Sequence, residues 1–518
     1  MSRGSLALVL HAHLPYVRHP EHEQFLEEHW FYEAMIESYL PLLDALRRML
    51  DDGVRFRLTV SLSPTLLAMM RDALLLARFR HRLENLLELC DRELARRGAR
   101  ASERGLAYFY RARLRRLRVR FERDCRGDLA GAFASLQREG ALEILCCPAT
   151  HGFLPYLAVS RPAVRAQVAV GVAEYRRHFG CDPRGIWLPE CAYYPGLDEV
   201  LAEFGILYFI VETHGFRNAN PPPRHGTLEP LLTPSGVAVF GRDVDSAKQV
   251  WSSKEGYPGD PWYREFYRDI GHLRPEPYIR RYLPVGIRFD TGLKYHRVTG
   301  PTEDKRYYVR SRALERARVH AAHFVASREV QLRAARGRAP VVVAPYDAEL
   351  FGHWWFEGPD WLEAVLRLSQ GRVRTLTLAE YLAEHPPRQA SSLSFSSWGE
   401  HGYGEVWLNT QTDWIYPKLH RMAVAMTELA RIERPSPLER RGLNQAAREL
   451  LLAQSSDWPF LIRRGGAPSY AKARFEQHCA NFGLLERGVR RRRVPRAELE
   501  QMERQFCLFP GLDYRVYA

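Results

Sequence analysis

The sequence lacks the features of membrane, secreted and disulfide-bonded proteins. Its eight cysteines include no CxxC pair and show no regular spacing, so we interpret them as reduced thiols. The apolar run near the N-terminus, Leu6–Leu10, is too short for the hydrophobic region of a secretory signal. No later stretch is long and apolar enough to span a membrane. We therefore expect a soluble, cytoplasmic protein that has no membrane partner.

The positive charge shows little of the clustering that nucleic-acid binding requires. The formal net charge is +14, and nearly all of the positive charge is arginine scattered through predicted helices beside glutamates. The arginine-rich run at residues 111–123 carries leucines and a phenylalanine at helical spacing, which is typical of an amphipathic helix with a solvated basic face. The run Arg490–Arg493 is short. We expect no nucleic-acid partner.

The sequence does contain a hydrophobic core and a repeated strand pattern. Its 518 residues are 46% hydrophobic and 12% aromatic, enough for one large barrel with appended parts or for two to three domains. Seven short apolar runs are separated by helical or long connecting segments. They are residues 6–10, 56–62, 142–147, 185–188, 206–211, 237–240 and 339–344. This alternation predicts the parallel strands of an α/β sheet or barrel.

Polar residues closely follow each of the seven runs. They are His11, Ser63, Thr150 with His151, Glu190, Glu212, Arg242 and Asp347. In a (β/α) barrel, the loops that follow the C-terminal ends of the strands build the functional site. We therefore expect these side chains to share one pocket.

Two further parts of the chain are predicted to be helical. Residues 65–138 are leucine-rich with charged intervals and too long for an ordinary connection between strands, which indicates a helical insertion. A serine-rich loop at residues 388–400 precedes a part with apolar residues at helical spacing. We predict a catalytic barrel of residues 1–64 and 139–385, the insertion of 65–138, and a helical C-terminal domain of 386–518.

Two of the strand-end residues are carboxylic acids with aromatic residues nearby. Glu190 lies in GIWLPECAYYPG and Asp347 lies in APYDAELFGHWWFEG. Either one alone would be explained by capping of the next helix. Together, at strand ends of one barrel, they match the two carboxyl groups that cleave a glycosidic bond. One attacks or stabilises the anomeric carbon, and the other delivers a proton.

Histidines at the strand ends allow two interpretations. His11 and His13, in HAHLPY, face the same way because alternate side chains of an extended strand do so. The pair is suited to bind a metal, with one of the two carboxylates as a third ligand. It is equally suited to hydrogen-bond sugar hydroxyls. His151 and His214 are further strand-end histidines, which favours a role in the pocket.

Tryptophans are the third signal of a sugar site, since an indole face covers the apolar face of a pyranose. Core packing accounts for some of them. The candidates for sugar contact, with the histidine that precedes two of them, are Trp251, His353, Trp354, Trp355, Trp398 and Trp407. The loop that carries Trp398 and Trp407 contains glycines, which suits a binding platform better than a core.

Eight motifs, taken in order, resemble those of a known family. They are HAHLPYVRHP, CCPATHGFLP, WLPECAY, QVWSSKEGYPGDPWYREFYRD, GLKYHRVTG, APYDAELFGHWWFEG, SSWGEHGYGEVWLN and SSDWPFLI, and they extend over nearly the whole length. The chain resembles glycoside hydrolase family 57, and within it the enzymes that branch 1,4-α-glucans. The resemblance implies an incomplete seven-stranded (β/α) barrel with a helical insertion and a helical C-terminal domain. It also implies a retaining mechanism without metal or organic cofactor.

The resemblance assigns roles residue by residue. Glu190 matches the nucleophile of the family, and Asp347 matches its general acid/base. The other matched residues line the donor subsite (His11, His13 and His151) or come from later loops and the helical domain (Trp251, Trp398, Trp407 and Asp457). Glu190 would attack an α-1,4 linkage, and Asp347 would protonate the leaving chain and then activate a 6-hydroxyl. We expect a monomer or weak homo-oligomer that acts on amylose, amylopectin or glycogen.

One segment departs from the family pattern. Branching enzymes of the family carry a flexible loop, tipped by a tyrosine, that closes over the site. Here the segment is THGFRNANPPPRHGTLEP, with Arg224 and His225 where the tyrosine would fall, and no tyrosine lies between Phe209 and Phe240. Because a lid keeps water from the glycosyl-enzyme, we expect weaker transfer or more hydrolysis.

Other activities fit the same residues. An α-amylase or a 4-α-glucanotransferase of the same family would use the same two carboxylates. A metal-dependent carbohydrate deacetylase would use the HxH pair on a similar barrel. A non-catalytic glucan-binding protein is a further alternative, because the loop is altered.

Overall fold

The computed structural model describes residues 4–252 and 255–518. Residues 1–3, in the first part of the predicted barrel domain, and Ser253 and Lys254, within the motif QVWSSKEGYPGD, lie outside the described residues. Among the described residues, no helix combines the length and the apolar character that a membrane crossing needs.

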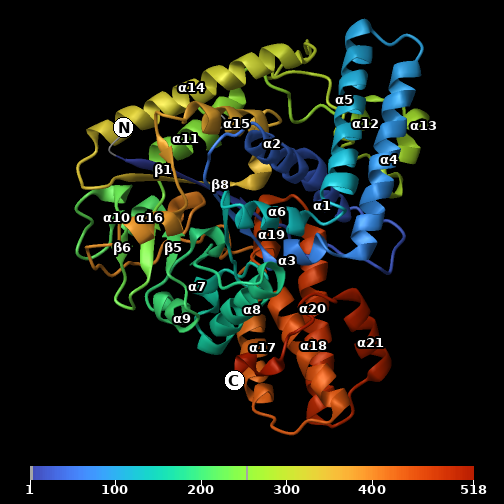
Figure 1. The fold of residues 1–518 in the computed structure, drawn as a ribbon. Coiled ribbons are helices and arrows are strands. Elements are labelled where there is room, and N and C mark those ends of the chain that lie inside the picture. The colour runs from blue at the N-terminus through green and yellow to red at the C-terminus, as the bar shows by residue number, and fades with distance from the viewer. Residues whose placement is uncertain (1–3, 253–254) are drawn as a thin grey trace.

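Seven parallel strands in the described part of the chain form an incomplete barrel (Figure 1). They are β1 (Ser5–Ala12), β2 (Leu58–Leu62), β3 (Leu142–Leu145), β4 (Gly185–Ile186), β5 (Tyr208–Val211), β7 (Ala238–Gly241) and β8 (Val341–Asp347). Hydrogen bonds join β3, β2, β1 and β8 into one sheet and β4, β5 and β7 into another. Each strand overlaps one of the seven predicted runs, so the predicted strands and the (β/α) fold are confirmed.

The two sheets meet at seams that few hydrogen bonds hold. At one seam, just beyond β3 and β4, the N–H of Trp187 donates to the carbonyl of Cys146 at 2.9 Å. At the other seam, the N–H of Asp243 donates to the carbonyl of Val343 in β8 at 2.9 Å. The pairings of these strands within each sheet and the Cys146–Ile186 bridge between the sheets are all parallel, so the C-terminal ends of the seven strands face the same side.

Two strands were not predicted. β6 (Leu231–Leu232) pairs antiparallel with β7, and β9 (Arg374–Thr375) pairs with the start of β1. Two residues each are too few for a period-two pattern, which is why the sequence shows no signal for them.

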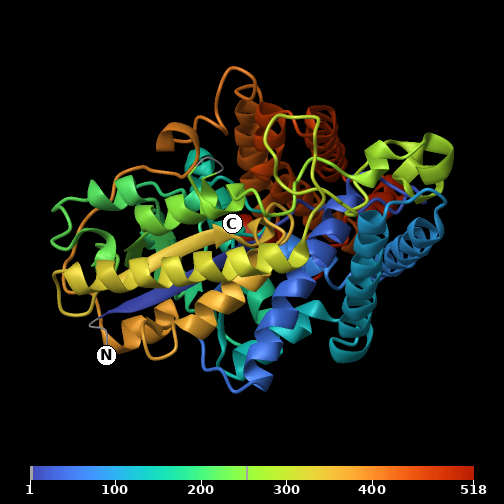
Figure 2. The same cartoon turned by 90° about the horizontal axis from the view of Figure 1, so that it is seen from above.

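Helices cover the outside of the barrel (Figures 1 and 2). The long ones are α2 (Leu40–Asp51), α8 (Arg161–Phe179), α14 (Arg310–Ala334) and α15 (Gly358–Leu368). Figure 2 shows α14 running along the barrel over β8, and α15 lies between α14 and α2. The buried residues of α15 include Trp361, Leu362, Val365 and Leu366 on one face, as expected of a helix packed on a sheet.

A helical hairpin projects from the barrel beside α12 (Ile270–Leu273) and α13 (Glu276–Ile279) (Figure 1). The predicted insertion consists of α3 (Pro64–Met69), α4 (Ala73–Ala95), α5 (Ala101–Val119) and α6 (Leu129–Arg138), of which α4 and α5 form the hairpin. The hydroxyl of Tyr110 in α5 donates to the carbonyl of Lys294 at 2.7 Å, so the hairpin supports the segment that follows α13. The exact domain bounds stay a prediction.

The C-terminal part is a group of helices that reaches back to the barrel. They are α17 (Ile415–Ala430), α18 (Pro437–Ala453), α19 (Asp457–Arg464), α20 (Pro468–Arg490) and α21 (Arg496–Gln505). α18 packs against α17, α20 and α21 (Figure 1). At the start of α19, the N–H of Ser456 donates to the carbonyl of His151 at 3.1 Å. This bond holds the N-terminus of α19 at the barrel mouth.

The loop after β8 is anchored by a glycine and a buried ion pair. Gly352 has a φ of +119°, and a Cβ there would lie 1.8 Å from the carbonyl oxygen of Glu37. The carboxylate of Glu37 accepts a hydrogen bond from the Arg264 guanidinium at 2.9 Å and lies 3.1 Å from Nδ1 of His353. The loop therefore packs directly on the helical segment that contains Glu37.

Replacing Gly352 with alanine should destabilise the fold and misplace the end of β8. Both the backbone conformation and the collision with Glu37 oppose a side chain, so we expect a cost of about 3 kcal/mol or more. Gly371→Ala is the control, because Gly371 also has a positive φ, of +73°, but has nothing within 4 Å of the added Cβ. It should cost only about 1 kcal/mol. Equal urea midpoints for the two variants would contradict this account.

Candidate active site

The strand ends and the start of α19 enclose a cavity of about 390 Å³. The cavity lies at the barrel mouth and is of a size typical of small-ligand sites. Most of the predicted site residues line it: His11, His13, His151, Glu190, Trp251, Asp347, Trp398, Trp407 and Asp457. Residues from opposite ends of the chain thus meet in one pocket.

Glu190 is held in an unusual backbone conformation just after β4. Its φ and ψ are 64° and 22°, in the left-handed region that non-glycine residues seldom adopt. One carboxylate oxygen accepts a hydrogen bond from the indole N–H of Trp398 at 2.6 Å, and the other accepts one from the hydroxyl of Ser456 at 3.1 Å. Such strain is common where a side chain must be aimed at a substrate. The carboxylate of Glu190 is therefore fixed in direction.

Asp347 is the last residue of β8 and pairs in register with His11 of β1. The pKa of Asp347 is raised to about 8, mainly by burial; the negative charge of Glu349 contributes to the rise and Arg242 opposes it. The neighbouring guanidinium is itself bound by Glu212 at 2.7 Å. A carboxyl group with this pKa keeps its proton at neutral pH, which a general acid requires.

Asp347 has the higher proton affinity of the two carboxyl groups, as expected if it is the acid and Glu190 is the nucleophile. The pKa of Glu190 is raised to about 7, mainly by burial; the hydrogen bond from Trp398 opposes the rise and the charge of Asp347 contributes to it. The pair interacts, so the two protons belong to a coupled system. Near neutral pH the favoured single-proton state has Asp347 protonated and Glu190 ionised. This state places a nucleophile and a proton donor in the same cavity.

The histidines form a stacked and hydrogen-bonded cluster. Nε2 of His11 lies 2.9 Å from Nε2 of His151, and the rings of His13 and His151 stack with centroids 3.8 Å apart. Burial lowers the pKa of His11 and of His151 well below the usual value, so both rings are neutral. Neutral imidazoles suit hydrogen bonds to sugar hydroxyls.

Metal binding was the alternative interpretation for the HxH pair. Nδ1 of His11 lies 3.2 Å from the Ser61 hydroxyl, and Nε2 of His13 lies 3.0 Å from the carboxylate of Asp457. In the described ranges, no group of three or more His, Cys, Asp and Glu side chains is placed to hold a metal ion. The rings are engaged with hydroxyl, carboxylate and imidazole partners.

Three tryptophans, Trp251, Trp398 and Trp407, form a wall of the cavity. Trp398 meets Trp251 edge to face, with ring centroids 6.3 Å apart at 75°. Trp407 is 1% exposed and stacks on Phe153 at 4.8 Å, so it supports the wall and presents little surface. His214 does not line the cavity, and its Nε2 is 2.9 Å from the carbonyl oxygen of Gly402.

The prediction that Trp355 contacts sugar was wrong. Trp355 is 1% exposed and packs between Tyr263 and Trp361, with ring centroids 5.5 and 5.4 Å away. The turn after β8 directs it into the core beneath α15. His353 does not line the cavity either, because its ring faces Glu37.

Trp354 points the other way from its neighbour. It is 56% exposed and lines a second cavity that adjoins the first. That Trp354 contacts sugar therefore stays a prediction, and the contact would occur in the second cavity.

Glu349 is the main site residue that the sequence analysis missed. It lines the cavity two residues after Asp347, accepts hydrogen bonds from the hydroxyl of Tyr39 and from the N–H of His13, and has a pKa raised to about 7 by burial. The DAEL motif contained this carboxylate, but only the short turn after β8 brings it back into the cavity. Arg464 and Phe460 of α19 also line the cavity and were not predicted.

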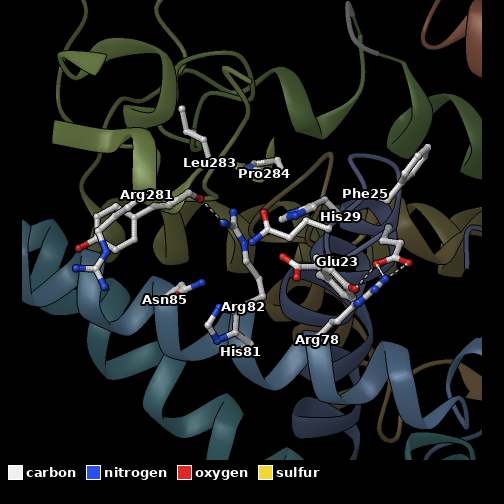
Figure 3. Close-up of a pocket in the computed structure, with 14 residues that line it drawn as sticks. Glu23, Phe25, His29, Arg78, His81, Arg82, Asn85, Arg281, Leu283 and Pro284 are labelled. Atoms are coloured by element: carbon white, nitrogen blue, oxygen red, sulfur yellow. Dashed lines mark hydrogen bonds and ion pairs between the residues drawn. The ribbon is translucent and has the colours of Figure 1, made fainter. Parts of the chain in front are cut away.

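Another cavity of about 250 Å³ lies between α1 (Glu28–Ala34), α4 and the segment around Tyr282 (Figure 3). Here the carboxylate of Glu28 accepts a hydrogen bond from the Arg78 guanidinium at 2.6 Å, and the Arg82 guanidinium donates to the carbonyl of Tyr282 at 2.8 Å. It shares no described lining residue with the catalytic cavity. The carboxylate of Glu28 in this cavity is paired with the Arg78 guanidinium.

Comparison with known proteins identifies the family. A profile of glycosyl hydrolase family 57 matches residues 7–338, and a profile described as the 1,4-alpha-glucan branching enzyme C-terminal region matches residues 418–517. The chain belongs to glycosyl hydrolase family 57. Asp347 lies outside both matched ranges, so its place in this family 57 site rests on the geometry at the end of β8.

The relatives of the chain include differently named enzymes. The 1,4-alpha-glucan branching enzyme TK1436 of Thermococcus kodakarensis is 36% identical over 520 residues, covering 93% of this chain and 73% of that protein. The solved alpha-amylase AmyC of Thermotoga maritima is 40% identical, with a TM-score of 0.93 over 100% of this chain and 99% of that one. The solved family 57 branching enzyme of Pyrococcus horikoshii is 35% identical, with a TM-score of 0.89 over 99% and 97%.

The charge of Glu349 should set the alkaline limb of the pH profile. Activity requires ionised Glu190 and protonated Asp347, so kcat/KM should rise with pH through about 7 and fall through about 8. Glu349→Gln removes a charge that raises the pKa of Asp347. The alkaline limb should then move down by roughly one pH unit.

Trp398→Phe is the matched variant for the other limb. It removes the N–H that lowers the pKa of Glu190, so the acid limb should move to higher pH while the alkaline limb stays in place. A profile in which Glu349→Gln moves only the acid limb would contradict the assignment of Asp347 as the acid.

Proposed function

We propose that the protein is a 1,4-α-glucan branching enzyme that acts by a retaining double displacement. The observation that carries this proposal is the contact between the nucleophile and the C-terminal domain. Ser456 donates to the carboxylate of Glu190, and Asp457 binds His13. Asp457 belongs to the range that matches the branching-enzyme C-terminal profile. That domain is therefore part of the catalytic cavity.

The first half of the reaction transfers a glucan chain to the enzyme. The Glu190 carboxylate attacks the anomeric carbon of an α-1,4-linked glucose, and the bond to the leaving O4 breaks. Asp347 gives its proton to that oxygen, which releases a shortened glucan with a new 4-hydroxyl. The donor chain is left as a covalent ester on Glu190.

The second half transfers the chain to an acceptor. Ionised Asp347 takes the proton from a 6-hydroxyl of a second glucan, and that oxygen attacks the anomeric carbon of the ester. The Glu190 carboxylate leaves, and an α-1,6 bond forms with the original anomeric configuration. If water enters in place of the 6-hydroxyl, the same steps give hydrolysis.

Hydrolysis by an α-amylase is the second candidate function. The similarity to the alpha-amylase AmyC over the full length favours it. The segment that would form a lid favours it as well. Arg224 and His225 line a separate cavity of about 220 Å³, and the N–H of Arg224 donates to the Gln389 side chain at 3.0 Å. Neither residue covers the catalytic cavity.

Incubation with linear amylose separates these functions. Branching yields α-1,6 bonds, seen as short chains released by a debranching enzyme, whereas hydrolysis adds only reducing ends. Glu190→Gln and Asp347→Asn should each lower this rate by about a thousandfold or more. A rise in reducing ends without α-1,6 bonds would indicate an amylase, and longer linear chains would indicate a 4-α-glucanotransferase.

The lack of a tyrosine-tipped lid should make hydrolysis a substantial side reaction. A longer loop tipped by tyrosine, grafted between Asn218 and His225, should raise the ratio of branching to hydrolysis because it excludes water from the ester. The control is the same graft with phenylalanine at the tip. An unchanged ratio in the tyrosine graft would contradict this role of the lid.

A further inference from the structure

A second cavity of about 730 Å³ adjoins the catalytic cavity. The two share Trp251, which stands between them. The second cavity, here called the adjoining cavity, is built by residues 258–267, 298–305 and 350–354. In Figure 2 the first two of these segments belong to the yellow-green loops near the yellow-green helices α12 and α13.

The adjoining cavity has an aromatic platform on its wall. The rings of Phe266 and Trp354 stack with centroids 4.5 Å apart at 18°, and Tyr267 meets Phe266 edge to face at 5.2 Å. Trp354 is 56% and Tyr267 is 79% exposed. Large aromatic side chains held in place and facing solvent are suited to cover the apolar faces of pyranose rings.

The wall of the adjoining cavity also holds polar atoms that lack a partner. One oxygen of Glu265 accepts a hydrogen bond from the Lys305 ammonium at 3.0 Å. The other oxygen of Glu265, which is 9% exposed, and the hydroxyl of Thr299 have no hydrogen-bond partner among the described residues. Buried polar atoms are costly without a partner, and a side-chain rotation toward the cavity would let ligand hydroxyls supply one. Because Lys305 balances Glu265, a neutral polyhydroxylated ligand fits better than an anion.

The adjoining cavity takes part of its wall from the loop that directly follows Asp347. Its residues Leu350 and Trp354 follow Asp347 closely in the chain, whereas the histidine cluster comes from β1 and the loop after β3. A general acid protonates the oxygen of the leaving chain and later deprotonates the hydroxyl of the acceptor. Both of these chains must therefore lie on the side of the reacting bond that Asp347 faces.

We propose that the adjoining cavity binds the acceptor α-glucan, and the leaving glucan before it. Tyr267, Phe266 and Trp354 form the stacking surface, and Glu265 and Thr299 accept hydrogen bonds from glucose hydroxyls. Trp251 separates this chain from the donor chain. The assignment rests on the proposed transfer function, and it extends that function by placing the second substrate.

The test uses an α-maltosyl fluoride donor, whose fluoride leaving group needs no glucan site on the acceptor side. Fluoride release without acceptor reports the donor side, and its acceleration by maltohexaose reports the acceptor. Tyr267→Ala and Trp354→Ala should each lower the ratio of transfer to hydrolysis by about fivefold to tenfold through a raised KM for maltohexaose. Tyr108→Ala is the control, because Tyr108 is 61% exposed on α5 and lines neither cavity.

The possible results separate the two claims. If maltohexaose accelerates the wild type and both variants equally, the acceptor assignment is wrong while the transfer function stands. If no transfer product forms even in the wild type, the transfer function fails. Calorimetry of maltohexaose binding then tests whether the adjoining cavity binds the leaving glucan. Weaker binding to both variants than to Tyr108→Ala supports this assignment, and equal binding overturns it.

Discussion

The burial of two carboxyl groups at one end of a parallel barrel is the constraint on which the site depends. Seven strands send their C-terminal ends to one side, and Glu190 and Asp347 end up in the same cavity. Desolvation is the largest cause of the raised pKa of each group. The surrounding side chains then separate the two, because Trp398 favours the ionised form of Glu190 and Glu349 favours the protonated form of Asp347.

The same constraint explains why the C-terminal helices are required at the barrel mouth. A buried carboxylate needs hydrogen-bond donors, and β4 alone does not provide them for Glu190. Trp398, from the loop before α17, and Ser456, at the start of α19, supply them. The catalytic cavity is thus a junction between the barrel and the helical domain. Loosening this junction would change the proton affinities as well as the shape of the site.

Features that depend on local patterns were predictable from the sequence, whereas side-chain directions set by turns were not. The seven strands and the residues directly after them were evident, because apolar runs and strand ends are local features. Beyond β8, the alternation of a strand no longer applies. A short turn and Gly352 decide that Glu349 faces the cavity, Trp355 the core and Trp354 the adjoining cavity. The ion pair of Glu37 with Arg264, 227 residues apart, has no local signal at all.

The central claim is that Glu190 becomes covalently bonded to the donor glucan while Asp347 handles the proton. The most direct measurement is mass spectrometry of peptides after reaction with a ring-fluorinated α-glucosyl fluoride, which slows release of the glycosyl-enzyme. We expect one added fluoroglucosyl group on the peptide that contains Glu190. A label on Asp347 or Glu349, or complete turnover by hydrolysis through inversion at the anomeric carbon, would contradict it.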